Sequence, residues 1–477
     1  MIKFINRHEE LAFLENKWLE KKSNFVVIYG KRRVGKTELI KQFIKNKNAI
    51  YFLADKRTTR DQLRELGQLV GEHFNDDLLV KNGFNEWLDV FVYLKKNVKE
   101  PFVFAIDEYP YLMETDKATS SVFQKGLDQY LKDSPVMLIL SGSSIAMMED
   151  QVLSYKAPLY GRRSGQILVE PLNFRQSWQF FEDKTFKDFI EYFTLTGGMP
   201  AYLLEIDPKK SVEDNLKNKI LDKKEFLHNE VEFILREELR EPRTYLSILK
   251  AISWGKTRAS EIINETGLEK NVLFKYLGVL EGLKLIVREV PVTEGNKLKS
   301  KRGIYKISDN FIRVWFQYVY PYKSNLEIAE YSEAINKFRT GFPVLTCFVY
   351  EQVCQEILKE NQKDMFSFEN VGRWWDNNDE IDVVGINSQS KQILFCEAKW
   401  SNKDVGTNIL DDLVEKSEKV DWNKGSRKEY FALFSKSGYT DALMKVAKER
   451  KDVFLFVENE MILKANLGMN QKLERSL

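Results

Sequence analysis

The segment from Gly30 to Thr37 places two glycines, a lysine and a threonine at the spacing G-x-x-x-x-G-K-[ST], through Gly30, Gly35, Lys36 and Thr37. Glycines at these positions let the backbone curl so that its N–H groups point at phosphate oxygens. The lysine then reaches the β and γ phosphates, and the threonine hydroxyl is placed for Mg²⁺. The pattern predicts a nucleotide site that uses Mg²⁺, and the alternative is a chance glycine turn.

A pair of carboxylates, Asp107 and Glu108, ends the apolar run FVFAI. Ligands of parallel sheets bind at the carboxyl ends of the strands. We predict that Asp107 holds Mg²⁺, directly or through water, and that Glu108 orients and deprotonates the attacking water. The alternative is a solvated acidic turn. Ser141, in the SGSS that ends the next apolar run, is predicted to sense the γ-phosphate or hold the water, unless it belongs to an ordinary polar turn.

Three more charged residues near these motifs are assigned to the same site. Arg162, in PLYGRRSG, is predicted to stabilise transition-state charge within the subunit or across an interface. A surface basic turn is the alternative for Arg162. Arg33 lies inside the glycine-rich loop, and Glu38 directly follows that loop. We assign both residues to nucleotide binding.

A second set of candidate residues lies far along the chain, in EIDVVGI and KQILFCEAKW. Asp382 and Glu397 offer the hard oxygen ligands that divalent metals prefer. Lys399 shares a strand face with Glu397, because side-chain direction repeats every two residues, and it would position or activate a hydrolytic water. Glu351, on a preceding helical segment, completes the candidate metal site. Although E-x-K is common in solvated strands, the order of these residues is typical of PD-(D/E)XK endonucleases.

Apolar strands alternate with helical patterns around the loop and the first carboxylates. This alternation predicts an α/β fold, with a parallel sheet covered by helices on both faces. We place this P-loop core at residues 1–172 and a helical lid at 173–241. Residues 311–477 are predicted to form a restriction-endonuclease-like α/β domain.

Residues 242–310 carry three short amphipathic helical patterns followed by two apolar strands, which predicts a winged helix-turn-helix. Gly267 marks the turn before the third helix. The loop between the strands is cationic and suits the phosphates of double-stranded DNA. Its cations are Lys297, Lys299, Lys301 and Arg302. The alternative is a protein-docking module with a charged tip.

The composition bounds the remaining possibilities. At about 150 residues per domain, 477 residues suggest about three domains. The net charge of +2 creates no strong overall field toward nucleic acid or membrane, so any such contact depends on local patches. Three scattered cysteines and three histidines make a zinc site unexpected. No apolar run approaches the roughly 18 residues that span a bilayer, so we expect a cytoplasmic protein that does not bind membranes.

The motifs FINRHEEL, YGKRRVGKTEL, FAIDE, LSGSS, PLYGRRSG and GGMPAYL together resemble those of archaeal-type ATPases, a branch of the AAA+ and STAND P-loop superfamily. The resemblance covers about the first 240 residues and implies ATP rather than GTP. It implies that Asn6, Arg7 and Glu10 lie near the adenine, and that Pro200 packs against the base from the lid. Spacing alone would make GGMP only a loop between helices. Residues 310–477 resemble the nuclease-like domain that such ATPases commonly carry.

These observations predict an ATP-binding, Mg²⁺-dependent ATPase whose nucleotide state controls DNA-associated winged-helix and nuclease-like domains. The alternative is a STAND-type ATP switch that acts through protein–protein contacts in signalling or defence, with a silent nuclease-like domain. A third hypothesis is a nuclease that the ATPase only regulates. Each hypothesis leaves room for a homo-oligomer or a protein partner.

Overall fold

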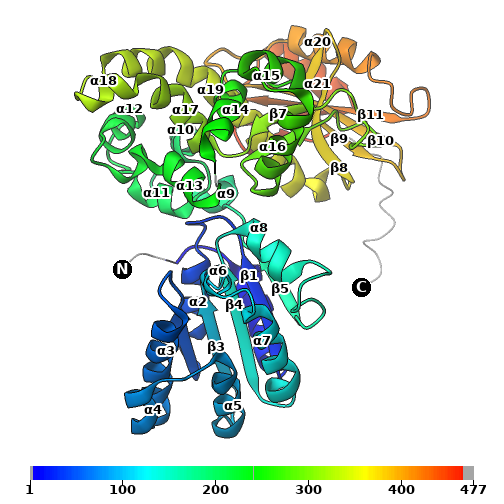
Figure 1. The fold of residues 1–477 in the computed structure, drawn as a ribbon. Coiled ribbons are helices and arrows are strands. Elements are labelled where there is room, and N and C mark those ends of the chain that lie inside the picture. The colour runs from blue at the N-terminus through cyan, green and yellow to red at the C-terminus, as the bar shows by residue number, and fades with distance from the viewer. Residues whose placement is uncertain (1–3, 240, 466–477) are drawn as a thin grey trace, which may run out of the picture. The chain divides into compact units, whose positions relative to one another are not determined.

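The computed structural model describes residues 4–239 and 241–465 (Figure 1), and the chain forms two compact units that are described separately. The first unit comprises residues 1–172 together with 199–201 and 282–284. The second comprises residues 173–198, 202–281 and 285–477. The finer division of the chain into four parts stays a prediction.

A five-stranded sheet forms the centre of the first unit. Its strands run in parallel in the order β2-β3-β4-β1-β5. Their bounds are β1 Asn24–Tyr29, β2 Ala49–Leu53, β3 Phe102–Asp107, β4 Val136–Gly142 and β5 Gly165–Leu168. Every residue of β1, β3 and β4 is buried, as expected for strands covered on both faces. The predicted α/β fold with a parallel sheet is confirmed.

Helices connect these strands and supply the rest of the apolar core. They are α1 His8–Leu19, α2 Lys36–Ile44, α3 Thr59–Phe74, α4 Asp77–Asn82, α5 Trp87–Asn97, α6 Pro110–Thr115, α7 Thr119–Gly126 and α8 Ile145–Met148, with π-helical segments at Leu127–Leu131 and Glu149–Leu153. Strand β4 lies between β1 and β3, so the strand before the glycine-rich loop does not pair with the strand that carries the carboxylates. The two motifs therefore meet at the carboxyl edge of the sheet, across β4.

The second unit begins with short helices and then forms three helices and a hairpin. The early helices are α9 Phe174–Trp178, α10 Phe186–Thr196, α12 Val212–Asn215 and α13 Glu230–Glu238, while α11 Pro200–Glu205 begins in residues assigned to the first unit. The next elements are α14 Pro242–Ser253, α15 Ala259–Thr266, α16 Lys270–Gly282 and the antiparallel strands β6 Ile286–Glu289 and β7 Ile304–Ile307. Gly267 caps α15 with a left-handed φ of 69°. The predicted order of elements is present, and the winged-helix identity stays a prediction.

A six-stranded mixed sheet follows three more helices. The helices are α17 Asn310–Tyr318, α18 Lys323–Glu327 and the long α19 Ser332–Glu360. The sheet has the order β13-β12-β11-β10-β9-β8. Its strands are β8 Asn370–Trp375, β9 Glu380–Asn387, β10 Gln392–Lys399, β11 Lys428–Ser435, β12 Val453–Val457 and β13 Glu460–Leu463, with α20 Thr407–Glu418 and α21 Asp441–Glu449 between them. Strands β8 to β10 are antiparallel and β10 to β12 are parallel.

Two features of the composition have structural counterparts. Cys354 and Cys396 are buried free thiols, as expected for small apolar side chains, and Cys347 is half-buried. Within residues 4–239 and 241–465, no helix combines the length and the apolar character needed to cross a bilayer.

Candidate functional site

The glycine-rich loop joins β1 to α2, and both of its motif glycines are required by the backbone. A Cβ atom on Gly30 would lie 2.3 Å from the carbonyl oxygen of Val169, so a larger residue does not fit. Gly35 is the N-cap of α2 and has a left-handed φ of 96°, which favours glycine. Apart from Gly35 and its two chain neighbours, no atom of the described chain lies within 4 Å of the position of a Gly35 Cβ. The loop therefore leaves open space at the N-terminus of a helix, where anions bind.

Lys36 is the first residue of α2 and is only 4% exposed. Its Nζ donates hydrogen bonds to the carbonyl oxygens of Gly30 and Lys31, each at 3.0 Å. The ammonium group therefore lies inside the curve of the loop and holds its two ends together. A phosphate that enters the loop meets this charge directly.

Asp107, at the end of β3, is fully buried and is surrounded by hydroxyl donors. Its Oδ2 accepts hydrogen bonds from Thr37 Oγ1 at 2.6 Å and from Tyr51 OH at 2.8 Å. Its Oδ1 accepts from Ser141 Oγ and from the backbone N–H of Glu108, the latter at 3.0 Å. The structure thus brings together the predicted residues Thr37, Asp107 and Ser141.

Tyr51 was not predicted from the sequence. It reaches Asp107 from β2, the strand that pairs with β3. Burial, and after it the charge of Asp107, raises the pKa of Tyr51, so the hydroxyl remains a donor. The sequence gives no signal for this contact, because it depends on which strand lies beside β3.

Glu108 follows directly, in a left-handed conformation with φ 55°. Its Oε2 accepts hydrogen bonds from the Oγ of Ser143 at 2.7 Å and from the backbone N–H of Ser143 at 3.2 Å. Ser143 is 2% exposed, so this partner is fixed by its surroundings. Two serines of the SGSS segment therefore contact different carboxylates: Ser141 contacts Asp107, and Ser143 contacts Glu108.

The arrangement fits a nucleotide with a divalent metal. The open space at Gly35 and the buried Lys36 suit phosphate groups. The oxygen atoms of Thr37 and Asp107, 2.6 Å apart, are ligands of the kind that Mg²⁺ prefers. These two residues would hold the metal, which would neutralise charge on the phosphates.

Two other predicted residues, Arg7 and Arg162, are held by contacts within the first unit. The guanidinium of Arg7, a residue 7% exposed, pairs with Glu10 at 3.0 Å and donates to the carbonyl oxygens of Val34 and Glu170. It therefore ties the N-terminal segment to the glycine-rich loop. Arg162 forms an ion pair with Asp128 at 2.9 Å, and must leave it to reach a phosphate.

The remaining predicted residues are placed as follows. Arg33 adopts a left-handed φ of 66° within the loop. The side chain of Glu38 lies on the outer side of α2 and is 69% exposed, with its carboxylate 3.8 Å from Lys41 Nζ. Pro200 is the first residue of α11. For all of these the nucleotide contact stays a prediction.

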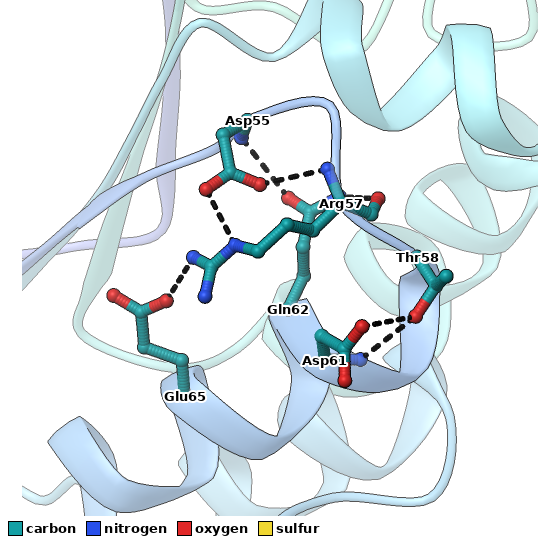
Figure 2. Close-up of polar contacts among 6 residues, drawn as sticks. All are labelled: Asp55, Arg57, Thr58, Asp61, Gln62 and Glu65. Atoms are coloured by element: carbon teal, nitrogen blue, oxygen red, sulfur yellow. Dashed lines mark hydrogen bonds and ion pairs between the residues drawn. The ribbon is translucent and has the colours of Figure 1, made fainter.

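The connection from β2 to α3 is fixed by its own polar contacts (Figure 2). Arg57 donates from Nε to Asp55 at 2.6 Å and also pairs with Glu65 on α3. The buried Gln62 donates to the carbonyl oxygen of Arg57 at 3.1 Å and accepts from the N–H of Asp55. Thr58 caps the helix. These contacts hold the exit of the strand that carries Tyr51.

The second candidate site lies on β9 and β10. Asp382 and Glu397 are each 7% exposed. Asp382 Oδ2 accepts a hydrogen bond from the N–H of Ala398 at 2.9 Å, and Lys399 Nζ lies 2.6 Å from Glu397 Oε1. Burial and the neighbouring charge of Glu397 raise the pKa of Asp382 to about 6. The structure thus brings Asp382, Glu397 and Lys399 together.

Glu351, the fourth predicted member, lies on α19 beside an arginine that sequence reasoning missed. Arg373 of β8 has its Nε 3.8 Å from the Glu351 carboxylate and its Nη2 2.9 Å from Glu380. Burial and the charge of Asp382 raise the pKa of Glu351 to about 8. Among the described residues, no group of three or more acidic, histidine or cysteine side chains is placed to hold a metal ion. The predicted metal-binding role of these residues stays a prediction.

The cationic loop between β6 and β7 is partly occupied by contacts with β8. The N–H of Val292 donates to the carbonyl oxygen of Arg373 at 2.9 Å. Arg302 pairs with Glu294 at 3.2 Å, and its guanidinium lies 5.8 Å from the ring centroid of Trp374. The other three predicted cations are exposed, and we call them the hairpin lysines: Lys297, Lys299 and Lys301.

Two protein-family models match the chain. Residues 4–206 match an ATPase domain described as predominantly from Archaea. Residues 315–411 match a family described as archaeal and bacterial proteins of unknown function. The first match includes the glycine-rich loop, the carboxylates Asp107 and Glu108, and the SGSS segment.

Individual proteins match to different extents. An uncharacterized protein of Methanocaldococcus jannaschii is 34% identical over 460 residues, which are 95% of this chain and 98% of the relative. An uncharacterized ATP-binding protein of the same organism is 60% identical over 47 residues, which are 10% of this chain and 80% of that protein. Among solved structures, a Walker-type ATPase of Pyrococcus abyssi is 24% identical, with a TM-score of 0.49, and the match covers 66% of this chain and 96% of that one.

Proposed function

The chain belongs to the archaeal-type ATPase family, and from this premise we propose that it hydrolyses ATP in a reaction that depends on Mg²⁺ held by Thr37 and Asp107. The observation that carries this proposal is the group of donors around the fully buried Asp107 carboxylate. This group supports a role for Asp107 in orienting Thr37 toward the phosphates. A structural carboxylate would not need to lie beside the glycine-rich loop.

The residues of the first unit have separate roles in the proposed reaction. Lys36 exchanges its carbonyl partners for the β and γ phosphates when ATP enters the loop. Glu108, held by Ser143, accepts a proton from water as the water oxygen forms a bond to the γ-phosphorus. The bond from the γ-phosphorus to the bridging oxygen breaks, and ADP and phosphate leave.

We further propose that the nucleotide state controls contact between the second unit and double-stranded DNA. The exposed hairpin lysines support this proposal, because clustered cations on a loop suit backbone phosphates. The rival proposal is a switch that works through protein contacts. The contacts of Val292 and Arg302 with β8 support this rival, because part of the loop then packs against another element of the protein.

A second candidate activity is cleavage of phosphodiester bonds by the second unit. The approach of Asp382, Glu397 and Lys399 on adjacent strands supports it. Asp382→Ala would then abolish cleavage of plasmid DNA and leave ATP hydrolysis intact.

One experiment tests these proposals together. ATP hydrolysis and plasmid nicking are measured with Mg²⁺ in the wild type and in Lys36→Ala, with and without double-stranded DNA. Stimulation of ATP turnover by DNA in the wild type supports the DNA proposal. Equal turnover with and without DNA, and no retardation of DNA at low salt, would favour the protein-contact switch.

A further inference from the structure

A large cavity in the second unit lies beside the second candidate site, because Glu351 and Arg373 line it. It has a volume of about 1040 Å³. Its walls come from the end of α14, from β7, from α17 and from the long helix α19. Its volume lies at the upper end of small-ligand pockets, which span about 300–1,000 Å³.

One wall of the cavity carries three large apolar side chains that are each about half exposed. Trp254, Val344 and Phe348 line it and are 47%, 56% and 47% exposed. Exposed apolar side chains that gather at a cavity mark a surface that a ligand covers. Two of the three are aromatic. The ammonium group of Lys250 lies over one face of Trp254, 4.3 Å from the ring centroid, so a planar ring would stack on the other face of Trp254 or on Phe348.

Another wall contains Arg313, whose guanidinium donates to the carbonyl oxygen of Ile307 at 2.9 Å. Within the part of the chain that the structure describes, no carboxylate lies within 4.0 Å of this guanidinium. Burial lowers the pKa of Arg313, and the more distant charges of Glu289 and Asp309 act in the opposite direction. The other buried cations of the cavity are already paired, Lys306 with Glu289 at 2.8 Å and Arg373 with Glu380 at 2.9 Å.

The charged side chains that line the cavity are four cations, Lys306, Arg313, Lys337 and Arg373, and three carboxylates, Glu289, Glu351 and Glu380. The lining therefore carries one formal positive charge in excess, which suits one anionic group beside a wall that suits an aromatic ring. We propose that the cavity binds a nucleotide unit, with the phosphate at Arg313 and the base against Trp254 and Phe348. The unit belongs to a free nucleotide or to an unpaired nucleotide of a nucleic-acid strand, and the two share this chemistry.

The walls of the cavity come from elements that also carry parts of the proposed DNA function. Strand β7 belongs to the cationic hairpin, and α19 carries Glu351. The proposal thus deepens the nucleic-acid part of the proposed function, on which it rests, and names the ligand class as an unpaired nucleotide unit. The ATP site is separate from it.

The test uses the full chain with Lys36→Ala, so that the glycine-rich loop does not compete, and EDTA, so that no cleavage occurs. Three probes are titrated: thymidine 5′-monophosphate, a fluorescent single-stranded oligothymidine, and a blunt duplex. Arg313→Gln is expected to weaken binding of the single strand about tenfold or more, because it removes a charge-assisted contact. Phe348→Leu keeps the apolar volume, removes the stacking ring and is expected to weaken binding about fivefold or more. Arg339→Gln is the matched control, because Arg339 is an exposed arginine on α19, the helix that carries Phe348.

A second measurement does not depend on the folding of any variant. A single strand with 5-iodouracil is crosslinked by light to the protein that keeps all cavity residues, and the attached peptide is identified by mass spectrometry. Attachment at Trp254 or Phe348 supports the proposal. Binding of the monophosphate as tightly as the oligonucleotide would identify a free nucleotide as the source.

The outcomes separate this proposal from the proposed function. Wild-type affinity in Arg313→Gln and Phe348→Leu, with crosslinks outside the cavity, would overturn the cavity proposal while duplex binding keeps the DNA function. If none of the probes binds, both the cavity proposal and the proposed contact with DNA are wrong. The proposed ATP hydrolysis is not affected by that result, because it is measured in the protein that keeps Lys36.

Discussion

Replacing Tyr51 by phenylalanine removes one hydroxyl donor from Asp107 and leaves the ring in place. The lost hydrogen bond is 2.8 Å long and ends on a carboxylate that is fully buried. A hydrogen bond to a charged group contributes about 1.5–3 kcal/mol. Asp107 retains Thr37, Ser141 and the N–H of Glu108 as donors, so the carboxylate is not left unsatisfied. We therefore expect the lower half of this range, a loss of about 1.5–2 kcal/mol in the free energy of unfolding of the first unit.

The assay is urea unfolding of the nucleotide-free protein, followed by circular dichroism. Tyr29→Phe is the matched control, because Tyr29 is a buried tyrosine of the same sheet whose hydroxyl makes no hydrogen bond in the described structure. Equal unfolding free energies for Tyr51→Phe and Tyr29→Phe would refute the reasoning. ATP binding is expected to survive in Tyr51→Phe, since the loop and Lys36 are unchanged.

Three further predictions concern other parts of the chain. Ser143→Ala frees the Glu108 carboxylate, so kcat should fall about tenfold with little change in the KM for ATP, and steady-state kinetics measures the split. Burial lowers the pKa of His228, so the folded protein binds fewer protons than the unfolded chain below about pH 6.5 and loses stability there. Between pH 7 and pH 5, His228→Gln should lose stability less steeply than the wild type, while the exposed His8→Gln should follow the wild type in the same unfolding series. Neutralising all three hairpin lysines should reduce the salt slope of duplex binding by up to about 3, and an unchanged slope in salt titrations would exclude the hairpin from the contact.

The parts of the site that lie within one short segment, or at the ends of neighbouring strands, were predictable from the sequence. The motif of the glycine-rich loop is local, because its four defining residues all lie between residues 30 and 37. Asp107 and Ser141 were predictable because both end apolar runs, and parallel strands bring such ends to one edge. The ATPase fold and ATP binding follow from these motifs and are confirmed.

Other contacts depend on pairings that the sequence does not specify. Tyr51 meets Asp107 only because β2 pairs with β3. Arg373 on β8 lies beside Glu351 on α19, a residue about twenty positions earlier in the chain. The spacing of these two residues does not indicate that they meet. The hydrogen bond from Val292 to Arg373 joins the hairpin loop to β8, and the sequence pattern does not indicate that these two elements meet. Long-range pairing of this kind is decided by packing, which a local pattern does not encode.

We propose that this chain hydrolyses ATP with Glu108 as the base. The most direct measurement follows bound ATP and released phosphate in the same sample for the wild type, Glu108→Gln and Lys36→Ala. Glu108→Gln is expected to bind ATP and to hydrolyse it about 100-fold more slowly or worse, the usual effect of losing a general base, whereas Lys36→Ala should bind none. Hydrolysis by Glu108→Gln at the wild-type rate would contradict the account.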